Sequence, residues 1–354
     1  MTFDEKDQAY EIDSEMEADV GIFARLRVGI QNWIDDIRYA KGPARKDLLG
    51  RFILFIPAVA SIFTILMILL LLVYEATPIF AHPDGGLGII FDSTWAPQLP
   101  DNPSYGILIF IVGSFTTTFL AIGIAVPLGL GGAIFLSEFC PAQIRTPLKM
   151  IVEMMAAIPS IVYGLWAFVV LRPFMDDAFA PFVQTNPLTS WMPWFQGSLK
   201  NGYSLLTGGV ILAIMLLPTV VTVSYDALQS VPGTYREASF ALGATKSETA
   251  KQIVLSAALP GVGAAVVLSL GRAVGETMAI LMVTGNNFGI PFTLFDQCYV
   301  MTSIIANQMG AAYNRPIWRS ALFSVALVLM IMSVIFTLIA KLFIRWGLKT
   351  RGMS

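Results

Sequence analysis

The stretch ILFIPAVASIFTILMILLLLVY, residues 53–74, contains no charged side chain. A helix needs about 20 apolar residues to cross the hydrocarbon core of a bilayer, so this stretch alone predicts a membrane span. The whole chain has the same character, with 56% hydrophobic residues, 13% charged residues and a mean hydropathy of +0.70. A soluble domain carries about 25% charged residues. The sequence therefore predicts an all-α integral membrane protein.

Working outward from residues 53–74, six apolar stretches are long enough to cross a membrane. They are residues 50–74, 105–136, 147–171, 204–226, 257–285 and 319–344. The second stretch is long enough to tilt, and Pro127 with the glycines after it predicts a kink or an end there. We therefore expect a six-span domain over 50–346, preceded by an arm over 1–49 and followed by a tail over 347–354.

The basic residues predict which way the chain crosses the membrane. Seventeen of the 22 Lys and Arg residues fall on one side if the N-terminus is placed inside. Short cytoplasmic loops carry the excess of Lys and Arg in membrane proteins. Both termini are therefore expected in the cytoplasm, and the chain in the inner membrane as a multi-pass protein.

The N-terminal arm differs from the rest of the chain. Residues 1–19 are acidic and polar, and apolar residues between Ile22 and Ile37 recur at helical spacing. That pattern predicts an amphipathic helix on the inner membrane surface or, equally, a helix packed on cytoplasmic loops. The net charge of −2 gives no basic field for nucleic acid, and a single histidine excludes a histidine-rich metal site. No GxxxxGK[ST] phosphate loop occurs, so any ATPase must be another chain.

The segment between the fourth and fifth predicted spans, residues 230–256, contains the signals of two short helices. Thr234 and Glu237 have the spacing of a capping box, and so do Thr245 and Glu248. Gly243 lies between them, where a left-handed residue ends the first helix. Capping alone allows either a rigid elbow or an ordinary helical hairpin loop.

The sequence EASFALGATKSETAKQIVLSAALPGV, residues 237–262, resembles the EAA loop of ABC importer permeases. The family pattern is E-A-A, three residues, G, nine residues, I-x-L-P. Five positions match it, and two depart from it at Ser239 and Ser256; the matches are Glu237, Ala238, Gly243, Ile253 and Leu255. The resemblance implies a type I ABC importer permease fold. It also implies that Glu237, Ala238 and Gly243 dock into a cytoplasmic ATPase and transmit its closure to the spans.

Two further stretches resemble one particular type within the ABC importer permeases. AAIPSIVYGLWAF, residues 156–168, and GRAVGETMAILMVTGN, residues 271–286, are similar to the phosphate-specific permease of the PstC type. The sister PstA type reads GETAP where this chain reads GETMA. The resemblance implies a transport subunit rather than an enzyme. It implies four kinds of partner: a PstA-type permease, two PstB-type ATPases that bind ATP and Mg, a PstS-type phosphate-binding protein, and the lipid bilayer.

Arg272 and Glu276 place opposite charges four residues apart in the fifth predicted span. On one helix face they can pair, either to hold two spans together or to line a path. Arginine offers a planar fork of donors that suits an oxyanion, and Glu276 would compensate its charge in an empty path. The resemblance implies a role in translocation for both residues. Ser160 and Tyr163 follow Pro159, which is expected to bend the third span beside the path.

Two other transporters and one non-transporter stay open at this stage. A permease for molybdate or sulfate shares the EAA loop but not the GRAVGETM match. An ion-gradient symporter predicts internal repeats with paired broken helices, which the sequence does not display. A membrane scaffold leaves the charge pair and the EAA loop without a role.

Overall fold

The computed structural model describes residues 43–83, 85–99, 102–187, 189, 191–197, 199 and 201–349. The acidic arm, the predicted amphipathic helix over 22–37 and the tail beyond 349 lie outside the described residues. The chain divides into two compact units, residues 1–70 and 71–354. The first unit contributes the beginning of one long helix, α3 (Pro43–Ala81), which includes the uncharged stretch 53–74.

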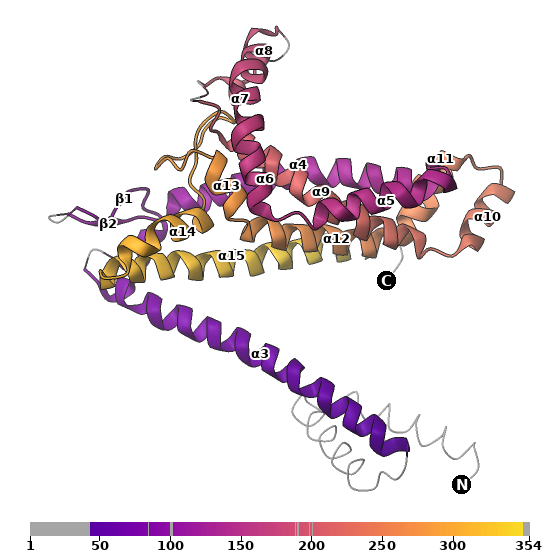
Figure 1. Cartoon of the computed structure of the whole chain (residues 1–354), viewed down its shortest axis with the longest axis horizontal. Coiled ribbons are helices and arrows are strands. Elements are labelled where there is room, and N and C mark those ends of the chain that lie inside the picture. The colour runs from indigo at the N-terminus through magenta and orange to yellow at the C-terminus, as the bar shows by residue number, and fades with distance from the viewer. Residues whose placement is uncertain are drawn as a thin grey trace. The chain divides into compact units, whose positions relative to one another are not determined.

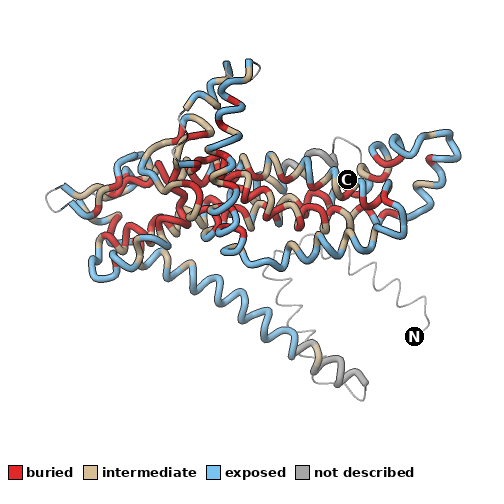
Figure 2. The backbone as a smooth tube through the Cα atoms, turned by 45° about the horizontal axis from the view of Figure 1, so that its top comes forward, coloured by how far each residue is buried: buried red, intermediate tan, exposed pale blue. Residues whose placement is uncertain are grey.

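Four long helices form the centre of the second unit, and each packs along another. They are α4 (Leu108–Ile134), α9 (Leu205–Gln229), α12 (Leu255–Gly275) and α15 (Pro316–Lys349). Helix α9 packs against both α4 and α12, and α12 packs against α15. Figure 2 shows that the buried backbone lies inside this bundle. Pro127 lies within α4 and does not end it: the helix continues to Ile134 and then widens into the π-turn η3 (Phe135–Phe139).

The third predicted span, 147–171, falls on two helices rather than one. Helix α5 (Ala142–Ala156) and the helical segment Ser160–Thr185 meet at an angle of 91°. Pro159 stands at the bend, as expected, because proline lacks the N–H that a continuous helix requires. The second segment runs in short α- and π-helical turns: α6 (Ser160–Trp166), η4 (Ala167–Leu171), α7 (Arg172–Phe174), η5 (Met175–Phe179) and α8 (Ala180–Thr185).

The fifth predicted span, 257–285, also differs from one continuous helix. Helix α11 (Lys246–Glu248), the π-turn η7 (Thr249–Val254) and α12 form one helical run that ends at Gly275. After a break, the short helix α13 covers Met278–Val283. The break follows Gly275, where Glu276 takes an extended conformation with ψ of 130°.

The two ends of the bundle carry different small elements (Figure 1). One end carries α14 (Met301–Ala312) and the antiparallel pair β1 (Trp95–Ala96) and β2 (Ser104–Tyr105), together with the 3₁₀ turn η2 (Leu87–Ile90). A further 3₁₀ turn, η6, covers Pro193–Phe195. The opposite end carries α10 (Gly233–Ala241) and α11.

The helices agree with a protein embedded in a bilayer. Among the described residues, five helices are long and apolar enough to cross a membrane, or six if the bent pair counts as one span. Their outward side chains are largely apolar, including Phe119, Leu128, Val169 and Leu338. The chain is an integral, multi-pass membrane protein.

Candidate functional site

Arg272 lies in the last turn of α12, on a face of the helix that the described chain leaves largely uncovered. Leu268, Gly271 and Gly275 are exposed, and with Arg272 they occupy positions i, i+3, i+4 and i+7 of one helical face. A Cβ added at Gly271 or Gly275 would meet nothing within 4 Å. The opposite face of α12, with Ser269 and Ala273, is buried in the bundle. Arg272 therefore points to a side of α12 that is free to line a path.

The guanidinium of Arg272 has few partners. Within the part of the chain that the structure describes, its one hydrogen bond is donated by Nη1 to Thr219 Oγ1 on α9, at 3.4 Å. That distance is longer than the usual 2.9–3.0 Å of an N–H···O hydrogen bond, so the bond is weak. Arg272 also lies close to the C-terminus of α12, whose helix dipole favours a cation. Most donors of the fork remain available to another acceptor.

Glu276 does not pair with Arg272. The expected pairing assumed one continuous helix, but α12 ends at Gly275, which turns Glu276 away from the shared face. No ion pair joins the two side chains among the described residues. Glu276 is 9% exposed, and its Oε1 accepts a 3.4 Å hydrogen bond from the backbone N–H of Ala279 in α13. Its backbone carbonyl accepts a hydrogen bond from Thr302 Oγ1 in α14, at 2.8 Å.

Tyr163 and Ser160 lie just beyond the bend in the third span. The Tyr163 hydroxyl donates to the backbone carbonyl of Met155 in α5, at 2.9 Å, and thus bridges the bend. Ser160 is the first residue of α6 and is part-buried. A Cβ added at Gly164 would lie 2.9 Å from Cα of Ala279, so α6 and α13 approach closely. These contacts bring the bend next to the break that holds Glu276. The path-lining roles of Ser160 and Tyr163 stay predictions.

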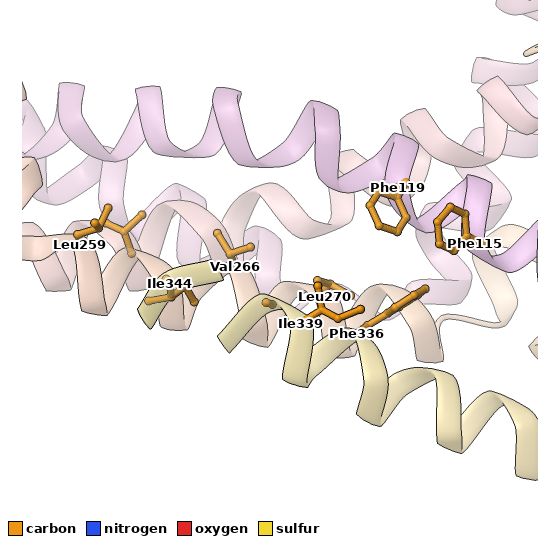
Figure 3. Close-up of a pocket in the computed structure, with 11 residues that line it drawn as sticks. Phe115, Phe119, Leu259, Val266, Leu270, Phe336, Ile339 and Ile344 are labelled. Atoms are coloured by element: carbon orange, nitrogen blue, oxygen red, sulfur yellow. The ribbon is translucent and has the colours of Figure 1, made fainter. Parts of the chain in front are cut away.

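A large groove elsewhere on the bundle has the wrong chemistry for an oxyanion. It has a volume of about 630 Å³ and lies between α4, α12 and α15. Figure 3 shows the side chains around it, and all of them are apolar: Phe115, Phe119, Leu259, Val262, Gly263, Val266, Leu270, Phe336, Ile339, Ala340 and Ile344. An anion cannot exchange its hydration shell for such a lining. The part-buried arginine outside this groove is the better candidate.

The predicted elbow between α9 and α12 is present, with one of its two capping boxes. Thr245 Oγ1 accepts from the backbone N–H of Glu248, and the Glu248 carboxylate accepts from the backbone N–H of Thr245. Gly243 has φ of 84°, in the left-handed region that glycine adopts without a steric penalty, and it separates α10 from α11. Both features confirm the sequence expectation.

The first predicted capping box, Thr234 with Glu237, is wrong. Helix α10 begins at Gly233, directly after Pro232, so Thr234 is already inside the helix and no side chain caps it. Pro232 is itself the N-cap residue, with an extended ψ of 140°, and the helical conformation starts at the next residue. Glu237 and Ala238 are instead exposed on the surface of α10. The exposed apolar side chains Tyr235, Phe240 and Leu242 accompany them.

Sequence reasoning missed the contacts that hold the elbow to the bundle. Arg236 forms an ion pair with Glu138 at the end of η3, at 2.7 Å between Nη2 and Oε1. Ser239 Oγ and Thr249 Oγ1 are 2.8 Å apart and buried, so the elbow is also tied to η7. The one sequence signal was Ser239, which departs from the second alanine of the EAA pattern. Nothing in the sequence joins positions 138 and 236.

Comparison with known proteins gives a family match over more than half of the chain. The family model described as "Binding-protein-dependent transport system inner membrane component" matches residues 140–346. This region includes the bent third span, the elbow and α12.

Individual relatives extend the similarity beyond that region. The chain is 39% identical over 247 residues to a probable ABC transporter permease protein YqgH of Bacillus subtilis, which covers 70% of this chain and 74% of that protein. It is 33% identical over 296 residues to a probable phosphate transport system permease protein PstC of Methanocaldococcus jannaschii, with 83% and 93% covered. A crystal structure of a bacterial ABC transporter that imports alginate has a chain of similar fold. Its TM-score is 0.56 at 15% identity, with 86% of this chain and 99% of that chain covered.

Proposed function

Because this chain belongs to the family of binding-protein-dependent transport system inner membrane components, we propose that it is the permease subunit of an ATP-driven phosphate importer. The observation that carries the proposal is Arg272, a part-buried arginine in a membrane helix, on a face that the described chain leaves largely uncovered. The relatives named as phosphate transport permeases support the choice of substrate. They are transport components, and so is this chain.

Arg272 supplies the recognition of the oxyanion. Phosphate entering a membrane must lose hydrogen bonds to water, and a guanidinium fork can replace them with two parallel N–H···O bonds. The weak bond to Thr219 leaves most of that fork unoccupied. Glu276, buried at the break between α12 and α13, places a negative charge near the passing anion. That charge keeps binding weak enough for release, which conduction requires.

The uncovered face of α12 would meet a second permease of the PstA type. Gly271 and Gly275 have the GxxxG spacing that lets membrane helices approach closely. A path between two such faces would have Arg272 on one wall. A PstS-type binding protein would deliver phosphate from the outer side of the inner membrane, and both termini of this chain would lie in the cytoplasm.

The elbow would couple this path to ATP hydrolysis. Glu237, Ala238 and the turn at Gly243 form its exposed surface, and the apolar side chains beside them offer area to bury. Two PstB-type subunits would hold ATP and Mg²⁺ and supply the free energy of hydrolysis. Helix α11 continues through η7 into α12, so a displaced elbow would move the helix that carries Arg272.

The test is uptake of inorganic phosphate by proteoliposomes that contain the complete complex, with native chain or Arg272→Ala. We expect Arg272→Ala to assemble and hydrolyse ATP while uptake falls by about tenfold to a hundredfold, since a hydrogen bond to a charged group contributes about 1.5–3 kcal/mol. Arg319→Ala is the matched control, because Arg319 is also a part-buried arginine in a span but pairs with Glu75 of α3, away from α12.

Three results would contradict the proposal. Phosphate uptake by Arg272→Ala at the native rate would show that Arg272 does not take part in translocation. Uptake of molybdate or sulfate in place of phosphate would identify a permease for another oxyanion. Uptake driven by an ion gradient without any ATPase subunit would place the chain among symporters.

A further inference from the structure

The ion pair between Glu138 and Arg236 joins the elbow to a span that lies far from it in sequence. Glu138 is in η3, the π-turn at the end of α4, and Arg236 is in α10. The guanidinium and the carboxylate make two contacts, Nη2 to Oε1 at 2.7 Å and Nε to Oε2 at 3.2 Å. Two parallel hydrogen bonds fix the angle between the groups as well as their distance. The pair therefore sets the orientation of α10 relative to the end of α4.

Arg236 also closes the end of α9. Its Nη1 donates to the carbonyl of Val231 at 2.8 Å, and its Nη2 donates to the carbonyl of Leu228 at 2.9 Å. Leu228 is in the last turn of α9 and Val231 lies just beyond its C-cap Ser230, so the arginine binds the carbonyls around the end of the helix, where lysine and arginine side chains commonly donate. One side chain thus holds α10, the end of α9 and the end of α4 together.

The π-turn η3 is the point where these contacts converge. Ser137 donates to the Glu138 carboxylate at 2.8 Å, and Gln229 of α9 donates to Ser137 Oγ at 3.1 Å. The ammonium of Lys246 in α11 lies 5.6 Å from the ring centroid of Phe139. Each of the three neighbouring segments thus contacts this one turn, α9 and α10 through hydrogen bonds and α11 through a cation–π contact.

On its other side, α10 is tied to a different span. The buried hydrogen bond between Ser239 and Thr249 joins α10 to η7, which continues directly into α12. The elbow therefore has two separate anchors. One leads to α4 through Glu138 and Arg236, and the other leads to α12 through Ser239 and Thr249.

The burial of the Glu138–Arg236 pair indicates that it fixes the orientation of α10 relative to α4 rather than adding stability. The side chains of Glu138 and Arg236 are 9% and 20% exposed. Desolvating two charges offsets much of their attraction, so apolar residues of similar volume commonly give equal stability at such a position. The two hydrogen bonds of the pair additionally fix the angle between the guanidinium and the carboxylate.

We propose that Glu138 and Arg236 are positioning residues that transmit movement of the elbow to α4, while the Ser239–Thr249 contact transmits it to α12. This inference rests on the proposed function, because it states that the same coupling elbow moves a second helix, α4, in addition to α12. Breaking the pair should leave ATP hydrolysis in place and lower the amount of phosphate imported for each ATP hydrolysed.

The test compares the native complex with Glu138→Gln and with the double variant Glu138→Leu/Arg236→Met, in proteoliposomes supplied with inorganic phosphate and ATP. The double variant removes both charges and keeps volume, so no uncompensated buried charge destabilises it. Lys149→Met is the matched control, because it breaks the exposed pair of Lys149 with Asp226 between α5 and α9. The readouts are co-purification of the ATPase, melting temperature, ATP hydrolysis and phosphate uptake.

We expect both test variants to assemble, and phosphate imported per ATP to fall about tenfold, within the range of measured coupling between sites. The Lys149→Met complex should keep the native ratio. A native ratio in either test variant would mean that the pair only stabilises the fold, and the inference would be overturned. A native complex that hydrolyses ATP without importing phosphate would instead overturn the proposed function.

Discussion

Arg236 in the elbow and Arg272 at the end of α12 are both part-buried, but their hydrogen bonds differ in number and length. Arg236 donates four, between 2.7 and 3.2 Å, to a carboxylate and to two backbone carbonyls. Arg272 donates one within the described chain, at 3.4 Å, to a threonine hydroxyl. Full satisfaction rigidifies a group, whereas a poorly satisfied charge keeps its capacity to bind. Arg236 therefore suits a rigid connection between segments, and Arg272 suits a binding site for an anion.

The buried glutamates of the two regions show the same difference, although Glu276 does not pair with Arg272. Glu138 accepts both arms of Arg236, and a hydroxyl besides. Glu276 is equally buried, yet its carboxylate accepts one 3.4 Å hydrogen bond from a backbone N–H. Arg272 and Glu276 thus keep unused bonding capacity, and Arg236 and Glu138 do not.

Charge reversal gives the largest expected effects and separates the two arginines. Arg272→Glu should leave assembly and melting temperature close to native, because it removes one weak bond, but should lower phosphate uptake by more than about a hundredfold. Arg236→Glu should instead destabilise the chain by about 3–5 kcal/mol, because it leaves Glu138 buried beside a like charge. Melting curves and uptake, measured on both, provide the check. Equal destabilisation by the two variants would show that the arginines do not differ.

Two glycines offer the next comparison, Gly164 in α6 and Gly271 in α12. Gly164→Ala should destabilise the chain by about 1–3 kcal/mol, because the new Cβ lies 2.9 Å from Cα of Ala279. Gly271→Ala meets nothing within 4 Å, and should stabilise the isolated chain by up to about 1 kcal/mol through helix propensity. Thermal unfolding of the purified chain in detergent measures both. If Gly271→Ala also weakens co-purification with a second permease, the uncovered face of α12 is that interface.

The sequence predicted what depends on local pattern. Apolar length located the spans, Pro159 located the bend, and Thr245 with Glu248 located the start of α11. The prediction failed where the exact residue at which a helix starts or ends decides the contacts that follow. Helix α10 starts at Gly233 rather than after Thr234, and α12 stops at Gly275, one residue before the glutamate that was expected to share its face.

The long-range contacts were beyond local pattern altogether. Glu138 and Arg236 are 98 positions apart, and each on its own has the sequence signature of an ordinary charge at the end of a span. Only the packing of α4 against α9 brings their segments together. The site residues were therefore predicted by residue type and family resemblance, and the joint that moves them was found from the fold.

A smaller effect distinguishes the two threonines of the elbow. Thr245→Val should cost about 1 kcal/mol, because it removes the capping hydroxyl from the start of α11. Thr234→Val should cost less, because Thr234 is exposed within α10 and the structure assigns it no capping bond. Hydrogen exchange of the amides in 246–249 measures the difference. Equal exchange in the two variants would mean that the capping box does not stabilise the elbow.

The smallest expected effect concerns Cys298, in the loop between α13 and α14. Complete burial raises the pKa of its thiol from an ordinary 9.0 to about 12. The folded state thus holds the thiol proton more tightly than the unfolded chain, and this contribution to stability is present below pH 9.0 and lost as the pH approaches 12. Since the thiolate is the nucleophile, N-ethylmaleimide should not label Cys298 between about pH 7 and pH 9 unless the chain is unfolded. Mass spectrometry of native and denatured protein provides the check, and rapid native labelling would show that the segment beside Thr117 opens to solvent.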